Sequence, residues 1–267
     1  MYDSFSNDYD RFVNWTSRLD FELPFIERKL QSLASSKGPA RLLDAACGTG
    51  MHAIALAKKG YATAGADYSA GMIDRAQANA QVAGARVPFV NAGFGQLAGA
   101  FHAHTPELLP FDALLCLGNS LPHLLTAADL AAALADFAAC LRPGGLLLIQ
   151  NRNFDAVLQQ RERFMEPQSY REGEGEWIYL RFYDYEPDGL IRFNIITLQR
   201  VAQAPWQQQI TSTPLYPLRQ AELVSALEVA GFGEIEPLGG MNGAPFDPAA
   251  SGNLVIVARK VPAGKLL

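Results

Sequence analysis

Short, almost continuously apolar runs alternate with segments of helical pattern along residues 41–151. The runs predict strands at 41–46, 61–67, 86–92, 111–118 and 146–151. The intervening segments predict helices at 51–60, at 69–84 and from Thr126 up to Pro143 and Gly144. Strands this apolar are buried on both faces, and right-handed crossovers place helices on each side of a parallel sheet. We therefore expect a doubly wound α/β domain.

Aromatic and β-branched residues replace this pattern after residue 155. They predict a long hairpin at 176–201 with its turn at 187–189, and a further antiparallel strand in 206–218. A helix is expected next in 218–232, followed by strands at 234–238 and 253–260. The predicted organisation is an N-terminal helical flap (1–40), a ligand-binding core (41–155), an antiparallel β cap or substrate lid (156–216) and a C-terminal part that completes the core (217–267).

Charge and composition narrow the class of function. The net charge of -5 argues against nucleic acid as a partner, because duplex binding needs a basic surface. No basic segment precedes an apolar run at the N-terminus, and no apolar stretch approaches about 20 residues. We expect a cytoplasmic protein without a membrane span. Three cysteines without metal-ligand spacing predict neither a disulfide nor a zinc site, and His102 and His104, in a predicted loop, predict no metal site.

A glycine turn with an acidic neighbour, LLDAACGTGMH (42–52), follows the first predicted strand. Gly48, Gly50 and Ala53 satisfy the loose pattern of dinucleotide-binding turns. Asp44 is poorly suited to a pyrophosphate, because two like charges about 4 Å apart repel by roughly 4 kcal/mol at an effective dielectric near 20. A ligand with cationic groups and no phosphate, such as S-adenosylmethionine, suits both features. Alternatively, Asp44 caps a helix or forms a turn.

Asp67 ends the second predicted strand, 19 residues after Gly48. This position is suited to accept hydrogen bonds from ribose hydroxyls, whichever nucleoside binds. A helix N-cap is the competing role for Asp67, and Ser69 competes for that cap. The glycine turn together with Asp44 and Asp67 thus predicts a nucleoside site at the carboxyl ends of the strands.

The stretches LLDAACGTG, AGADYSAGM and LRPGGLLLI together resemble the successive motifs of class I S-adenosylmethionine-dependent methyltransferases. The resemblance spans about residues 40–155. It implies a Rossmann-like seven-stranded sheet whose last strand is antiparallel, with S-adenosylmethionine as cofactor. The cofactor contacts it implies are Ala46, Gly48 and Gly50 in the turn, Asp67, and Tyr68 and Met72 beside the adenine. Met72 is equally well read as a core residue of its helix.

The stretches LCLGNSLPHL (115–124) and LLIQNRNFDAVL (147–158) are similar to glycine, sarcosine and dimethylglycine N-methyltransferases. The residues that bind the methyl acceptor in that group match Gly118, Asn119, Arg152 and Tyr216 in this sequence and, less directly, Tyr170. Leu117 and His123 fall near the methionine part of the cofactor. Where that group has a polar residue before an aromatic one, this chain has Gly93 and Phe94, which leaves backbone groups and ring stacking to recognise adenine.

Methyl transfer to an amine requires alignment more than covalent help. Arg152 is suited to hold an amino-acid carboxylate through two parallel hydrogen bonds, although a solvated arginine at the sheet edge is the other reading. Two other assignments have alternatives. His123 could instead cap the next helix, and the N-terminal residues Tyr9, Arg11 and Trp15 form either a flap over the cofactor or the start of a surface helix. We expect an N-methyltransferase of a small amine or amino acid, and a homo-oligomer is compatible with the sequence. Alternatives are O- or C-methylation of another metabolite, a nicotinamide-dependent oxidoreductase and a non-catalytic S-adenosylmethionine sensor.

Overall fold

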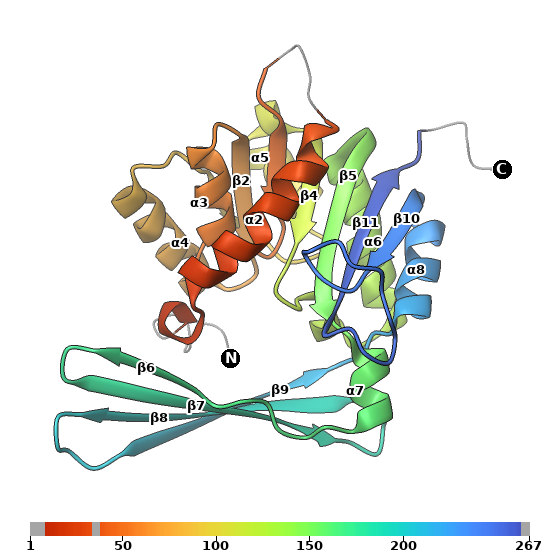
Figure 1. Cartoon of the computed structure of the whole chain (residues 1–267). Coiled ribbons are helices and arrows are strands. Elements are labelled where there is room, and N and C mark those ends of the chain that lie inside the picture. The colour runs from red at the N-terminus through yellow and green to blue at the C-terminus, as the bar shows by residue number, and fades with distance from the viewer. Residues whose placement is uncertain (1–8, 34–37, 263–267) are drawn as a thin grey trace.

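A seven-stranded sheet forms the centre of the protein in the computed structural model, which describes residues 9–33 and 38–262 (Figure 1). Its order is β10-β11-β5-β4-β1-β2-β3, and β11 alone runs antiparallel to its neighbours. The strands are β1 (Arg41–Asp44), β2 (Ala62–Asp67), β3 (Phe89–Asn91), β4 (Phe111–Cys116), β5 (Leu141–Arg152), β10 (Phe232–Leu238) and β11 (Asn253–Lys260). The predicted doubly wound fold with a reversed last strand is confirmed.

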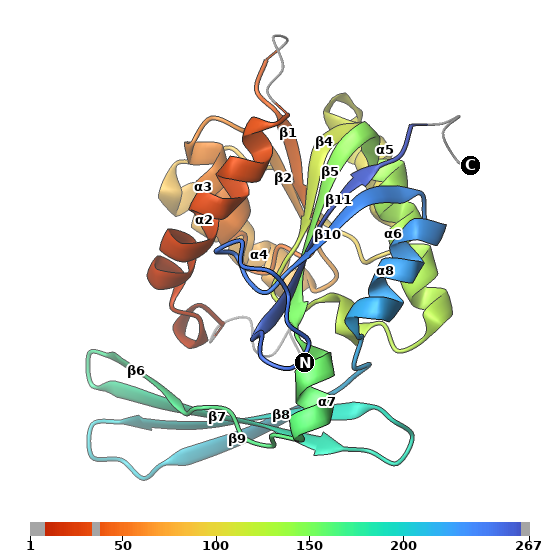
Figure 2. The same ribbon diagram turned by 45° about the vertical axis from the view of Figure 1, so that its right-hand side comes forward.

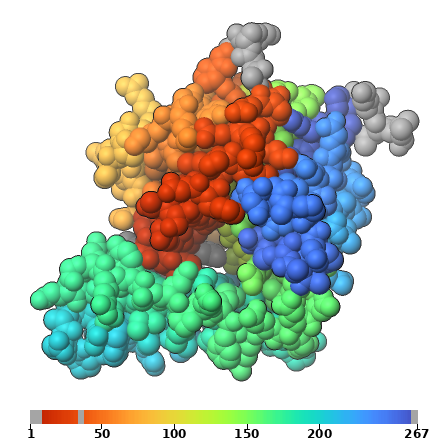
Figure 3. All heavy atoms as spheres, in the orientation of Figure 1, coloured from red at the N-terminus to blue at the C-terminus, as the bar shows by residue number. Residues whose placement is uncertain are grey.

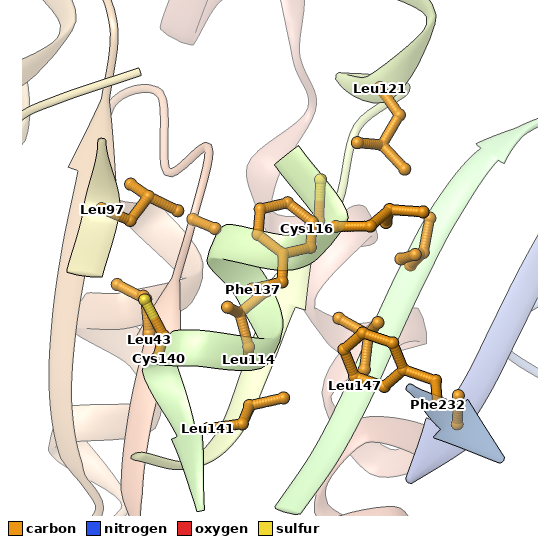
Figure 4. Close-up of a cluster of buried hydrophobic side chains, with 14 of the residues drawn as sticks. Leu43, Leu97, Leu114, Cys116, Leu121, Phe137, Cys140, Leu141, Leu147 and Phe232 are labelled. Atoms are coloured by element: carbon orange, nitrogen blue, oxygen red, sulfur yellow. The ribbon is translucent and has the colours of Figure 1, made fainter. Parts of the chain in front are cut away.

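Helices cover both faces of this sheet (Figure 2). On one face lie α2 (Trp15–Gln31), α3 (Met51–Lys58) and α4 (Ala70–Ala83), and on the other lie α5 (Leu97–His104), α6 (Ala127–Cys140) and α8 (Gln220–Val229). The strands alternate between two apolar cores, so that Leu43 and Leu147 point toward Phe137 of α6 (Figure 4) while Leu42 packs on the α2 side. Burial on both faces explains the continuous apolar runs in the sequence.

Side-chain caps set the starts of two of these helices. The Ser69 hydroxyl accepts a hydrogen bond from the Met72 backbone N–H (3.2 Å) at the start of α4. At α6, Thr126 accepts from the Asp129 N–H (3.1 Å) and donates to its carboxylate (2.6 Å). Both caps satisfy N–H groups that the helix itself leaves free.

A second, four-stranded antiparallel sheet lies beneath the carboxyl ends of the central strands (Figures 1 and 2). It comprises β6 (Gln168–Glu172), β7 (Gly175–Tyr185), β8 (Ile191–Val201) and β9 (Gln207–Leu215). We call this sheet the cap. The predicted hairpin corresponds to β7 and β8, and the predicted extra strand to β9. Side chains of Trp177, Tyr179 and Tyr183 are buried beneath the core, so odd-numbered residues of β7 form the inner face of the cap.

Some local elements differ from the predictions. His102 and His104 lie in α5 and not in a loop, because Leu97 and Phe101, one turn apart, bury that helix against the core. The helix α6 ends at Cys140, and β5 begins at Leu141, before the Pro-Gly pair that was expected to separate them. The helix α7 (Phe154–Gln160), the short helices η1 (Pro106–Leu108) and η2 (Leu121–His123), and strand β6 were not predicted. They are too short for a clear period.

No helix within residues 9–33 and 38–262 is long and apolar enough to cross a membrane. All three cysteines are buried with free thiols.

Substitution of Gly50 by Ala is expected to lower the free energy of unfolding by about 2–4 kcal/mol. Gly50 has a φ of 80°, and an added Cβ would lie 2.8 Å from the Phe89 ring and 2.9 Å from Ala76 Cβ. Gly84→Ala is the matched control, because its φ of 63° is also left-handed but nothing lies within 4 Å. It should lose only about 1 kcal/mol. Denaturant unfolding measures both, and equal losses would show that crowding around Gly50 is unimportant.

Candidate active site

A pocket of about 500 Å³ lies at the carboxyl ends of β1, β2 and β4. This is the edge of an open α/β sheet at which ligands bind. The pocket is lined by all but one of the predicted cofactor residues: Asp44, Ala46, Gly48, Asp67, Tyr68, Met72, Gly93, Phe94, Leu117 and His123. The exception is Gly50, which lies behind the turn against Phe89.

The carboxylate of Asp44 is buried in this pocket, and its charge is only partly compensated by the protein. Neither of its oxygens has a hydrogen bond of good geometry among the described residues, although the backbone N–H of Ala46 lies near enough to favour the ionised form. Burial raises the pKa of Asp44 to about 6, and the charge of Asp67 acts in the same direction against those of His52 and Arg18. A buried carboxylate without a well-placed donor is costly unless a ligand supplies one. The site therefore fits a ligand with an ammonium or other cationic donor.

Asp67 holds the glycine turn in place and also faces the pocket. One carboxylate oxygen accepts from the Gly48 N–H (2.8 Å), and the other accepts from the Ser69 N–H (2.9 Å). Because Ser69 caps α4, the competing N-cap role of Asp67 does not apply. Beyond Asp67, the Tyr68 ring is 84% exposed and its Cδ2 would lie 3.1 Å from a Cβ at Gly93. An exposed ring over a glycine is suited to stacking with a flat base.

The opposite wall comes from residues that the sequence analysis did not assign to the site. Arg18 of α2 and His52 of α3 line the pocket beside Asp44. The two side chains meet at the carboxylate of Glu22, which lies 3.2 Å from Arg18 Nε and 2.6 Å from His52 Nε2. Although burial raises the pKa of Glu22, its bonds to His52 and Arg18 hold it below the usual value. The spacing of Arg18 and Glu22 by one helical turn was the available signal.

The N-terminal segment bridges the core and the cap (Figure 3). Tyr9 and Trp15 line the pocket, whereas Arg11 binds Glu172 of β6 (3.0 Å) and lies over the Trp177 ring. Asp10 accepts from Trp15 Nε1 (2.9 Å) within the segment and binds the core through three groups: Thr49 Oγ1 (2.6 Å), Arg75 Nε (3.0 Å) and Asn79 Nδ2 (3.2 Å). The segment thus forms a wall of the pocket, as the flap reading requires.

The LGNS stretch forms a tight turn after β4. Gly118 and Asn119 both have left-handed φ angles, 77° and 67°, which glycine and asparagine tolerate best. The turn is bound to β5: the Asn119 N–H donates to the Gln150 carbonyl (3.0 Å), and Asn119 Oδ1 accepts from the Arg152 N–H (2.9 Å). Gly118 lines the pocket, whereas Asn119 does not. The side chain of Asn119 therefore positions the backbone from which Arg152 projects.

The remaining predicted residues lie at the edge of this arrangement. Arg152, at the end of β5, lies close enough to Tyr183 of the cap to affect its titration, although burial is the main cause that raises the pKa of Tyr183 to about 12. The Tyr216 hydroxyl donates to Glu222 (2.6 Å), and Tyr170 packs against Trp177. Arg152, Tyr170 and Tyr216 are not among the residues that line the pocket. Burial lowers the pKa of His123 to about 4, which keeps its imidazole neutral at pH 7.

Comparisons with known proteins agree with this geometry. A family described as "Methyltransferase domain" matches residues 42–145. The chain is 31% identical to the glycine/sarcosine N-methyltransferase of Aphanothece halophytica over 237 residues, which cover 89% of this chain and 81% of the relative. The chain belongs to the S-adenosylmethionine-dependent methyltransferases. The enzyme of the same name from Halorhodospira halochloris is 34% identical over 72% of this chain, but only 66% of that relative is covered.

Solved structures show the same fold for this methyltransferase. An S-adenosylmethionine-dependent methyltransferase from Clostridium acetobutylicum superimposes with a TM-score of 0.76 at 16% identity, covering 98% of this chain and 99% of that one. The aminopentose methyltransferase CalS10 from Micromonospora echinaspora gives 0.67 at 21% identity over 90% and 92%. Family membership makes S-adenosylmethionine the methyl donor. The partly compensated Asp44 carboxylate, the exposed Tyr68 ring and the Arg18 guanidinium are suited to its ammonium, adenine and carboxylate groups respectively.

The affinity of the methyltransferase for S-adenosylmethionine should depend on pH through Asp44. The free protein must lose the Asp44 proton to receive a cation, and its pKa is about 6. The dissociation constant should therefore be nearly constant from pH 7 to 8 and rise by about tenfold for each pH unit well below 6. Calorimetric titration at several pH values measures this. Asp44→Asn should remove the dependence, and a wild-type affinity that stays flat down to pH 5 would contradict the assignment.

Proposed function

We propose that this methyltransferase transfers a methyl group to the nitrogen of a small amino acid or a related carboxylate-bearing amine. The relatives named above act on glycine and sarcosine, which are small amino acids. The observation that carries the proposal is that the Arg152 guanidinium is unpaired. Its guanidinium has no ion pair or hydrogen bond with the described residues, although it lies close to the inner face of the cap. An unpaired guanidinium between the core and the cap is suited to bind the carboxylate of an acceptor.

The residues around the acceptor orient it and keep its amine uncharged. Bound S-adenosylmethionine supplies a methyl group on a positively charged sulfur, which an uncharged amine can accept. Arg152 would hold the carboxylate as a planar fork, leaving the amine free to point into the core. Burial keeps His123 neutral, with its pKa near 4, and keeps the Tyr183 hydroxyl protonated, with a pKa near 12. Neutral groups of this kind disfavour an ammonium ion, because they offer it no compensating charge.

The cap and the N-terminal segment complete this proposal. Thr213 of β9 lines the pocket together with Tyr9, so the acceptor would be enclosed between the core, the N-terminal segment and the cap. Residues 156–216 would then act as the substrate lid, and residues 41–155 with 217–267 as the catalytic core. Asn119 would act through Arg152, whereas a direct role of Tyr216 would require its hydroxyl to leave Glu222. A cytoplasmic location remains a prediction from the sequence.

A screen for S-adenosylhomocysteine tests the function. The full-length protein is incubated with S-adenosylmethionine and glycine, sarcosine, other amino acids, simple amines or hydroxy acids. We expect turnover with amines that carry a carboxylate and none with the hydroxy acid of the same skeleton. Turnover of the hydroxy acids alone would indicate O-methylation. Tight cofactor binding without turnover of any compound would leave a cofactor-binding sensor as the function.

A further inference from the structure

An arginine on the inner face of the cap, Arg181, has no role in the function proposed above. Arg181 lies in the middle of β7, between Tyr179 and Tyr183 in the alternating pattern that faces the core. It is paired across the sheet with Ile195, which is 3% exposed on the same inner face. The side chain therefore starts from an apolar, aromatic surface that covers the acceptor side of the molecule.

The guanidinium of Arg181 is poorly satisfied by the protein. Its Nε is buried and has no hydrogen-bond partner among the described residues. Its Nη2 donates to the Glu166 carbonyl at 3.4 Å, and its Cζ lies 5.3 Å from the centre of the Phe12 ring. Burial lowers the pKa of Arg181, Tyr183 opposes this effect, the charge of Arg152 adds to it, and no carboxylate is among the causes. An arginine in such surroundings is costly for the folded protein unless an anion reaches it.

The other arginines of the same sheet show the usual arrangement. Arg171 and Arg200 both bind Glu176, at 2.8 and 2.6 Å, and Arg192 binds Glu186 at 2.6 Å. Of the arginines on β6 to β9, within the part of the chain that the structure describes, Arg181 alone has no acidic partner. Acidic residues thus pair with the exposed arginines of the cap and not with the one that faces the core.

Arg152 and Arg181 carry like charges, and neither guanidinium has an acidic partner among the described residues. The charge of each arginine acts on the Tyr183 hydroxyl, and that of Arg152 also acts on Arg181, so the end of β5 and the middle of β7 bring the two charges into one neighbourhood. Two guanidiniums repel each other, and one carboxylate would leave one positive charge uncompensated in a half-buried site. Two negative charges would neutralise the pair and supply acceptors for its free N–H groups.

We infer that Arg152 and Arg181 together bind an acceptor whose anionic part carries two negative charges. The inference rests on the proposed N-methyltransferase function and narrows its substrate class. The two charges can belong to two carboxylates, as in an amino dicarboxylic acid, or to one phosphonate or phosphate group. In both cases the amine lies on the side of the pocket, and the dianion lies between β5 and β7. Arg181 is then a specificity-determining residue.

Matched acceptor pairs test this inference. L-aspartate is compared with L-asparagine, which has the same shape and one charge fewer, and aminomethylphosphonate is compared with glycine. Initial rates of S-adenosylhomocysteine formation give kcat/KM, and calorimetry gives binding to the protein saturated with S-adenosylhomocysteine. We expect the doubly charged member of at least one pair to be preferred by about tenfold to a hundredfold, because the analogue leaves a guanidinium unpaired. The preferred pair identifies the source of the charge.

Three variants separate a role in specificity from a structural one. Arg181→Gln should bring the preferred ratio to about one while changing the dissociation constant of S-adenosylmethionine less than twofold, and Arg181→Lys should retain part of the preference. Arg192→Gln, on the outer face, is the control and should retain it fully. Ratios near one in both pairs, together with turnover of glycine or sarcosine, would overturn the inference and leave the proposed function intact. Binding of aspartate or aminomethylphosphonate without turnover of any acceptor would support the anion site and reject the function.

Discussion

Replacement of Asp44 by asparagine should weaken the binding of S-adenosylmethionine by about two hundredfold to five thousandfold at pH 7.5. The carboxylate is 3% exposed, and neither oxygen has a hydrogen bond of good geometry within the described residues, so a bound cation would be its main partner. Removal of one member of a buried charge pair typically costs 3–5 kcal/mol, which corresponds to this loss. Calorimetry or equilibrium dialysis with S-adenosylmethionine measures the effect.

The same substitution should make the cofactor-free protein more stable. A folded-state pKa of about 6, raised from 3.8, means that ionised Asp44 destabilises the fold. This destabilisation is absent below pH 3.8, develops between pH 3.8 and 6, and is complete above about 6. Asparagine lacks the charge, so the free energy of unfolding at pH 7.5 should rise by about 1–3 kcal/mol. Asp74→Asn, at an exposed position of α4, is the matched control and should change neither quantity. Loss of affinity together with loss of stability would show that Asp44 supports the fold and not the ligand.

Replacement of Arg152 by methionine should lower kcat/KM for the acceptor by about a hundredfold to a thousandfold. Methionine retains much of the apolar stem but removes the fork that would hold the acceptor carboxylate, and loss of a buried ion pair at an interface costs about 2–5 kcal/mol. The dissociation constant of S-adenosylmethionine should change little, because Asp44, Asp67 and Arg18 remain. Initial rates at saturating cofactor give kcat/KM, and calorimetry gives the cofactor affinity.

Two further variants help to explain the expected loss of kcat/KM in Arg152→Met. Arg152→Lys retains the charge without the fork and should recover only part of the activity. Arg163→Met removes an arginine that binds Asp184 at the exposed surface of the cap, and it should leave kcat/KM unchanged. Unchanged kinetics in Arg152→Met would reject the carboxylate role. A parallel loss of cofactor affinity would place Arg152 on the cofactor side of the pocket.

Strong local patterns explain where prediction from the sequence succeeded. The apolar strands, the caps at Ser69 and Thr126 and the glycine turn each depend on neighbours within one or two turns of the chain, and all are confirmed. The short elements α5, α7 and β6 carry too few residues to show a period. Their packing against distant segments decides their conformation.

The cofactor side of the site was predictable because its residues follow the strands directly, and the carboxyl ends of parallel strands meet at one edge of the sheet. The opposite wall of the pocket, formed by Arg18 and His52, could not be predicted in this way. Glu22 binds both Arg18 and His52, which lies 30 residues away from it, and Asp10 reaches Arg75 across 65 residues of sequence. Side-chain pairs of such separation leave no periodic signal, since each depends on how whole elements pack.

The order of residues by itself determined the layered sheet, the glycine turn and the acid beside it, because periodicity and backbone preference act over a few residues. Only the tertiary structure decided that the Asp44 carboxylate is buried without a well-formed hydrogen bond among the described residues. The same packing left Arg181 facing the core without an acid, while exposed arginines of its own sheet found partners. Burial and charge compensation depend on everything that surrounds a group in space, and these quantities exist only once the chain has folded.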